Sequence, residues 1–125
     1  VNTSTRNPVD LGAFGFDARV MNHTMRSLDD EPGVDTLVAY FALDFMSLFP
    51  DEMIDQGLAA ITKAAASTKK PVMPVVFKSN ETDRRLESIR IKTLKSFRAA
   101  GLPVFFTLPS AVQGISRILR WSAGR

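Results

Sequence analysis

Two apolar runs of strand length, Leu37–Leu43 and Val72–Phe77, most constrain what this chain can fold into. Neither run alternates between apolar and polar residues, as a strand with one solvent-exposed face would. A continuous apolar strand is typical of a parallel sheet that is buried between two layers of helices. The sequence therefore predicts an α/β fold.

Helical sequence surrounds both runs, so that helices and strands alternate along the chain. Prolines, glycines and acidic pairs mark the ends of these helices, as expected for residues that break or cap a helix. The first helix carries Val20, Thr24 and Leu28 on one stripe, which is expected to face the core. Helices are predicted at 17–30, from about 50 to the turn at 69–71, at 82–100 and at 109–121, with a third, short strand at 103–107.

The chain shows neither internal repeats nor linkers, so we predict a single domain over residues 1–125 with right-handed crossovers. Three strands make a small sheet for a doubly wound fold, which usually carries five or six. Together with the polar start at Val1, this indicates a partial domain of a longer polypeptide. Pro74 cannot donate to a sheet, which leaves an edge position, a bulge or a strand starting at Val75 open.

Composition excludes several classes of site. The sequence has no cysteine, which rules out disulfides and cysteine-based metal sites, and its single histidine, His23, cannot build a multi-histidine site. We therefore predict no metal site. No apolar run approaches the roughly 20 residues that span a bilayer. The polar N-terminus lacks the apolar region of a signal peptide, so we expect a cytoplasmic location and no membrane partner.

Charge is divided unevenly along the chain, although the net charge is only +3. Residues up to Thr62 include three basic and ten acidic side chains, and the remainder includes 13 basic and three acidic ones. The basic half could bind an anionic partner, or the two halves could simply have differently charged solvent faces. The basic residues are dispersed along helical faces without an aromatic-rich basic loop, so no nucleic-acid partner is predicted.

Five short motifs follow one another over nearly the whole chain. They are the segment Asn7-Pro8-Val9-Asp10-Leu11, the helix end Asp30-Glu31-Pro32-Gly33-Val34-Asp35, the strand start Lys70-Pro71-Val72, the segment 99–105 (AAGLPVF) and the strand-to-helix step 107–112 (TLPSAV). Each motif alone is common at the ends of helices and strands in α/β proteins. In their order and spacing they resemble the NDP-forming acyl-CoA synthetase superfamily, which includes succinyl-CoA ligase.

The resemblance implies the C-terminal, flavodoxin-like CoA-ligase domain, a three-layer α/β sandwich with strand order 2-1-3-4-5. By analogy Val9-Asp10-Leu11 is the end of the second strand, and the first strand and its helix lie upstream of Val1. The absent first strand would be the centre of the sheet. The strand at Thr36–Leu43 would then have a bare edge, which we expect an upstream segment or another chain to cover.

The resemblance also implies a reaction in which a carboxylic acid, CoA and ATP give acyl-CoA, ADP and phosphate. CoA, the nucleotide and Mg²⁺ would be bound by the parent enzyme, whose remaining domains or subunit would be the partners of this domain. The phosphohistidine of the family lies in a glycine-flanked loop of another domain, which His23 does not match. No residue of this chain is therefore predicted to be catalytic, and the chain is not expected to be active alone.

In this family the matching domain lends a helix N-terminus to the phosphate site, and the corresponding segment here is Ala42–Asp51. This segment lacks the paired glycines of succinyl-CoA ligase, and Asp44, Asp51 and Glu52 would repel an anion. The alternative is a capped helix behind a hydrophobic loop, with Phe45, Met46, Leu48 and Phe49 packing on a neighbouring domain.

The candidate ligand residues lie where strands are expected to end, since α/β folds bind ligands at that edge. Asp10, with Asn7 beside it, could bind a ligand or could stabilise its own turn through an Asx hydrogen bond. Lys78 could contact an anion or could be a solvated loop lysine. The full set is Asn7, Asp10, Asp44, Ser47 and Lys78.

Two other functions remain open on the sequence. The first is a catalytically silent domain that senses acyl-CoA within a larger protein, such as a protein lysine acetyltransferase, and the missing glycines near Ala42–Pro50 favour it. The second is a flavodoxin-like interaction module.

Overall fold

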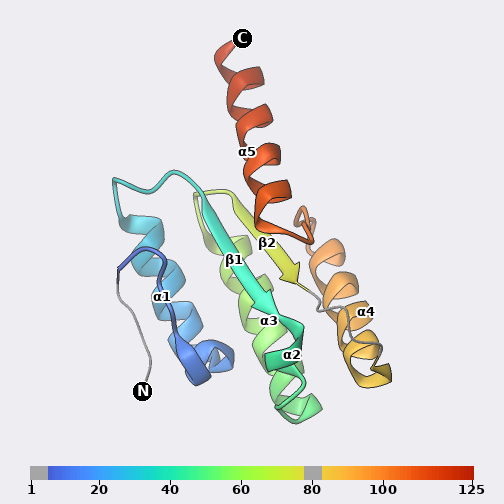
Figure 1. Cartoon of the computed structure of the whole chain (residues 1–125). Coiled ribbons are helices and arrows are strands. Elements are labelled where there is room, and N and C mark those ends of the chain that lie inside the picture. The colour runs from blue at the N-terminus through green and yellow to red at the C-terminus, as the bar shows by residue number, and fades with distance from the viewer. Residues whose placement is uncertain (1–5, 78–82) are drawn as a thin grey trace.

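The computed structural model describes residues 6–77 and 83–125. Helices precede, separate and follow two strands, and the two strands pair in parallel (Figure 1). The elements are the 3-10 helix η1 (Gly12–Phe16), α1 (Ala18–Asp30), β1 (Leu37–Ala42), α2 (Leu43–Met46), α3 (Asp51–Ser67), β2 (Val72–Phe77), α4 (Arg84–Ala99) and α5 (Leu108–Ala123).

β1 and β2 form a two-stranded parallel sheet whose register runs from Leu37 opposite Val72 to Ala42 opposite Phe77. This confirms the α/β class and the parallel pairing. β2 starts at Val72 and keeps its register through Pro74 without a bulge. The Leu37 N–H donates to the Pro71 carbonyl, so the odd-numbered residues of β2 point their backbone groups toward β1. The missing N–H of Pro74 therefore lies on the other side of β2.

The expected strand at 103–107 is wrong, because only Phe105 pairs with β2. The Phe105 N–H donates to the Pro74 carbonyl at 3.0 Å, and the Val76 N–H donates to the Phe105 carbonyl at 2.8 Å. The next two bonds of this ladder would need N–H groups from Pro74 and Pro103, which prolines lack. In the other direction Thr107 leaves the sheet as the N-cap of α5, where its hydroxyl accepts from the Ser110 N–H.

The core lies on one face of the sheet, where α1, α3 and α4 pack side by side (Figure 1). α3 contributes a stripe at helical spacing, and the ring of Phe97 from α4 lies 5.5 Å from that of Phe41 in β1. The buried α3 residues are Ile54, Gly57, Leu58, Ile61 and Ala64. At the end of α4, Gly101 has a φ of +73°, as predicted for a glycine following a helix.

α1 is rotated relative to the expected stripe. Met21 and Met25 are its buried residues, whereas Val20 and Thr24 are only half-buried. Asp17 begins the helix, because its carboxylate accepts from the N–H groups of Arg19 and Val20 at 2.8 and 3.2 Å.

α5 contacts β2 and projects beyond the rest of the molecule (Figure 1). Ala111 is its one buried residue. Gly114 lets the helix approach Phe105 closely, since a Cβ at this position would lie 2.7 Å from the Phe105 ring. Several apolar residues of α5 are exposed, at 61% for Val112 and 58% for Leu119.

Candidate functional site at the carboxyl end of the sheet

The carboxyl ends of β1 and β2 lead into α2, the loop 47–50 and the start of α3 on one side, and toward α4 on the other (Figure 1). This is the edge at which open parallel sheets bind ligands. Asp44 and Ser47 lie here, in and just after α2. Lys78, the third candidate for this edge, lies outside the described residues.

α2 was not predicted, because the segment was expected to be a hydrophobic loop. Its Leu43 and Met46 side chains are fully buried within this chain. The Ser47 hydroxyl donates to the Asp44 carbonyl at 2.7 Å, which closes the helix and occupies the one candidate hydroxyl. Phe49 is also internal, because its ring packs 5.5 Å from that of Phe16. Phe45 and Leu48 remain exposed, at 39% and 75%.

Arg85, at the start of α4, holds this loop in place. Its Nε donates to the Ser47 carbonyl at 3.1 Å and its Nη2 donates to the Phe49 carbonyl at 2.7 Å. Its Nη1 pairs with the Asp51 carboxylate at 2.9 Å. One guanidinium thus joins the N-terminal ends of α3 and α4. Sequence reasoning missed this residue, although an arginine in the first turn of a helix opposes the helix dipole and so signals another role.

The start of α3 is poorly suited to a phosphate. Pro50 occupies its N-cap and has no N–H, and Asp51 and Glu52 place two carboxylates in the first turn. The guanidinium of Arg85 is engaged by the loop carbonyls and by Asp51. An anion here would meet two negative side chains and a cation that is already bound.

Asn7 and Asp10 lie in the segment before η1, away from the α2 segment in sequence, and both residues are exposed. The Asp10 carboxylate accepts from the Gly12 N–H at 2.8 Å. This is the turn-stabilising alternative that the sequence left open for Asp10. Gly12 has a φ of 55°, which fits a glycine in that turn.

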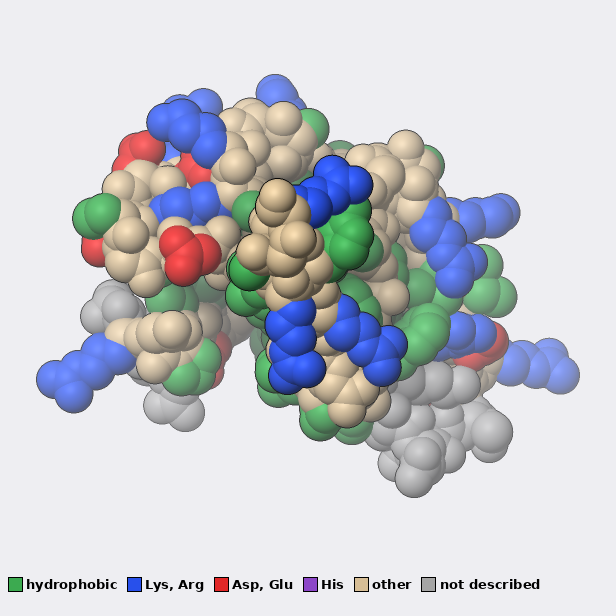
Figure 2. Space-filling model, turned by 90° about the horizontal axis from the view of Figure 1, so that it is seen from above, with side chains coloured by type: hydrophobic (Ala, Val, Ile, Leu, Met, Phe, Trp, Pro, Cys, Tyr) green, Lys and Arg blue, Asp and Glu red, His purple; other side chains and the backbone are tan. Residues whose placement is uncertain are grey.

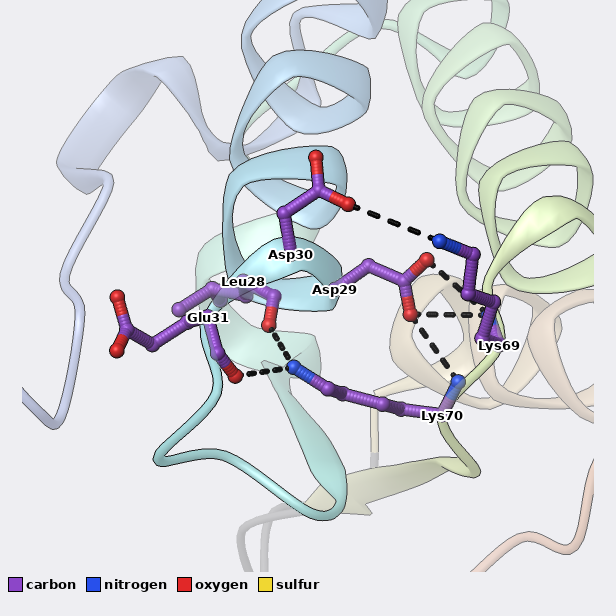
Figure 3. A network of polar contacts seen from close by, with 6 residues as sticks. All are labelled: Leu28, Asp29, Asp30, Glu31, Lys69 and Lys70. Carbon is purple, nitrogen blue, oxygen red and sulfur yellow. Dashed lines mark hydrogen bonds and ion pairs between the residues drawn. The ribbon is translucent and has the colours of Figure 1, made fainter.

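A second polar cluster lies at the opposite end of the sheet, where α1 ends and β2 begins (Figure 3). The Asp29 carboxylate accepts from the backbone N–H groups of Lys69 and Lys70 at 2.9 and 3.1 Å. The Lys70 ammonium donates to the carbonyls of Leu28 and Glu31 at 2.7 and 2.5 Å. Burial raises the pKa of Asp29, but the two backbone N–H groups outweigh this and hold it below its usual range. The hydrogen-bonding groups of this cluster pair with one another, so the cluster has a structural role.

Two of the depressions on the described surface are shallow and open. The larger, of about 410 Å³, runs along the flank of α1 past Val20 and His23, and the smaller, of about 230 Å³, lies on α5 beside Arg117 and Arg120. Neither encloses a ligand. Within residues 6–77 and 83–125, no group of His, Asp and Glu side chains could hold a metal ion.

Among the described residues, no helix is long and apolar enough to cross a membrane. No protein-family model matches the chain, and neither a curated protein nor a solved structure shows significant similarity to it.

Proposed function

We propose that this chain is a flavodoxin-like, three-layer domain of an NDP-forming acyl-CoA synthetase, and that its role is to complete the assembly of that enzyme rather than to carry out chemistry. The parent would convert a carboxylic acid, CoA and ATP into acyl-CoA, ADP and phosphate in the cytoplasm. CoA and the nucleotide with Mg²⁺ would be bound by its other parts.

The observation that carries the proposal is the order of the parallel segments. β1, β2 and Phe105 lie side by side in chain order, with α1, α3 and α4 on one face. This is the arrangement expected for strands three to five of a flavodoxin-like sheet. The motifs that resemble the superfamily fall at the ends of these elements, at 30–35, 70–72 and 99–105.

One observation favours the catalytically silent, acyl-CoA-sensing alternative. The helix start that would meet phosphate carries Asp51 and Glu52, and Arg85 ties its loop down. A domain that had lost the phosphate role could keep the architecture and tolerate these residues.

The test is turnover by the natural polypeptide at its full length. Purified protein is given ATP, CoA and a panel of carboxylic acids, and ADP and phosphate are measured. ADP production that requires both acid and CoA supports the synthetase. Binding of acyl-CoA without turnover would refute the synthetase proposal and favour the acyl-CoA-sensing domain.

A further inference from the structure

The chain exposes more surface than a compact protein of its size. Its accessible surface is 8395 Å² at a mass of 13.8 kDa. A compact monomer of that mass exposes about 6,600 Å², so the excess is about 1,800 Å². A stable protein–protein contact buries about 800 Å² on each partner, and less than half of the excess is therefore enough for one.

α5 carries an apolar stripe that is part of this surface. Val112, Ile115 and Leu119 recur at the spacing of one helical face, and Val112 and Leu119 are exposed. The helix is anchored near its start, where Ala111 is its one buried residue. Its later turns project past the end of the sheet at which β1 and β2 begin (Figure 1). The projecting half therefore exposes apolar side chains that the described fold does not cover.

β1 carries a second apolar patch, on the sheet face opposite the core. Val38 and Tyr40 are 41% and 47% exposed, and the Tyr40 ring stacks on that of Phe77 at 6.1 Å. On the same face α5 contacts β2, whose Met73 and Val75 side chains are buried. Figure 1 shows no described helix over β1 on this face. α5 thus covers one strand of the sheet and leaves the other open.

The charges around the two patches are opposite in sign. The sequence of α5 includes Arg117 and Arg120 and no Asp or Glu. Figure 2, which looks down on the projecting end of the chain, shows Lys and Arg side chains beside hydrophobic ones there. The loop 31–35, called the acidic loop below, carries Glu31 and Asp35, which are both exposed. It joins α1 to β1 at the same end of the sheet as the projecting half of α5 (Figure 1).

We propose that two copies of this chain pair through these surfaces, with α5 of each copy across the open β1 face of the other. The apolar stripe of α5 covers Val38 and Tyr40 of the second copy, and Arg117 and Arg120 approach its acidic loop. The same surfaces are buried on both copies, as in the two-fold dimers that are the commonest oligomers. The opposite charges fix the direction in which the helix lies.

An anionic membrane is the other surface that a basic amphipathic helix can bind. The observations favour a second copy, because Glu31 and Asp35 lie at the end of the sheet from which α5 projects and anionic lipids would repel them. A membrane bound by α5 would also leave the patch of Val38 and Tyr40 without an explanation. A second copy supplies each patch with an apolar cover and a charge of opposite sign.

Sedimentation equilibrium of the 125-residue chain tests the pairing. The purified chain is measured without ligand from about 1 to 200 μM, a range that brackets modest protein–protein affinities. We expect a reversible equilibrium between 13.8 kDa and twice that mass, with a Kd on the order of 10 μM.

Three single variants locate the contact. Leu119→Glu, in the apolar stripe, and Tyr40→Glu, on β1, should each raise Kd by about tenfold or more, because each buries a carboxylate in an apolar interface. Ile91→Glu is the matched control, since Ile91 lies on α4, outside both patches, and has the same 47% exposure as Tyr40. It should leave Kd unchanged. Circular dichroism checks that each variant folds.

A charge swap tests which surface meets which. Arg117→Glu with Arg120→Glu places two carboxylates opposite the acidic loop, and Glu31→Lys with Asp35→Lys places two ammonium groups opposite the arginines. Each double variant alone should be monomeric, because like charges meet twice across the two-fold axis. A 1:1 mixture of the two should dimerise, since each copy then meets the opposite sign. A mixture that stays monomeric would overturn the pairing of α5 with the acidic loop.

Three further results would overturn the proposal. The chain could remain monomeric over the whole concentration range. It could dimerise equally well with Leu119→Glu and Tyr40→Glu, which assigns the contact to another surface. It could stay monomeric and bind vesicles that contain phosphatidylserine, and lose that binding in the arginine double variant, which assigns α5 to a membrane. None of these measurements needs a substrate, so they can fail while the synthetase assay succeeds, and the reverse.

Discussion

The ammonium of Lys70 donates a 2.5 Å hydrogen bond to the backbone carbonyl of Glu31, which lies 39 positions earlier in the chain. A second bond, of 2.7 Å, reaches the Leu28 carbonyl in the last turn of α1 (Figure 3). The Leu28 and Glu31 carbonyls also accept a local backbone N–H, from Glu31 and Val34 respectively, so Lys70 adds a charged donor at the negative end of the α1 dipole. The contact also links two of the motifs that carry the family resemblance, 30–35 and 70–72.

Replacing Lys70 should therefore destabilise the fold. We expect Lys70→Met, which keeps the apolar stem, to lower the free energy of unfolding by about 1–2 kcal/mol, since two carbonyls lose a charged donor. Urea denaturation measures the change. Lys69→Met is the matched control, because the Lys69 ammonium makes a 4.0 Å ion pair with Asp30 between largely exposed side chains. Its effect should stay within about 0.5 kcal/mol, and an equal loss in both variants would contradict this account.

Asp29 should make stability depend on pH in the acid range. Its pKa in the folded chain lies below the ordinary value of about 3.9. A carboxyl with a lowered folded pKa stabilises the fold above that ordinary value and loses this contribution as the pH falls through the folded pKa. Asp29→Asn should thus lower Tm at pH 7 and at pH 5, and the difference from the wild type should shrink by pH 3. A constant Tm difference over this range would refute the assignment.

Replacing Gly57 even with alanine should destabilise the fold. A Cβ there would lie 2.7 Å from Cδ1 of Phe16 and 3.3 Å from the Phe16 carbonyl oxygen. Alanine gains up to about 1 kcal/mol in helix propensity, but we expect the clash, of about 1–3 kcal/mol, to win. Gly57→Ala should therefore unfold at lower urea. Adding Phe16→Leu should recover part of the loss, and Gln56→Ala, at the exposed neighbouring position, should be near neutral.

Arg85 should control the loop that follows α2. Arg85→Leu removes three hydrogen bonds to residues 47, 49 and 51, and Arg85→Lys should not replace them, because an ammonium lacks the guanidinium fork. The amides of Leu48 and Phe49, which donate to α2 carbonyls, should exchange faster in both variants. Arg84→Leu, at the exposed neighbouring position, is the control. Unchanged exchange in Arg85→Leu would show that packing alone holds the loop.

The sequence could predict the elements whose ends are set by residues close by in the chain. β2 occupies the residues of its apolar run, and α3 begins at Asp51, after the proline and with the acidic pair expected there. The parallel pairing followed from strands that are apolar on both faces. The three-layer, five-stranded form stays a prediction.

The misses came from effects that depend on partners distant in sequence. The strand at 103–107 fails because Pro74 and Pro103 meet across the same ladder, which no local pattern reveals. α2 forms because Leu43 and Met46 find room in the core. The role of Arg85 depends on α4 lying next to the loop 47–50. Asp10 could be read as a ligand or a turn residue; its bond to Gly12 shows the turn role, and ligand binding by Asp10 stays a prediction.

Pro74 and Pro103 also limit the side on which the sheet can be extended. Beside Phe105 the ladder stops because Pro74 and Pro103 have no N–H groups to donate. It therefore cannot be lengthened there without losing hydrogen bonds. Among the described strands, β1 pairs with β2 on one side and with no strand on the other. A strand that paired with β1 would bring an unpaired outer edge of its own, so the two prolines protect the sheet against added strands on the Phe105 side alone.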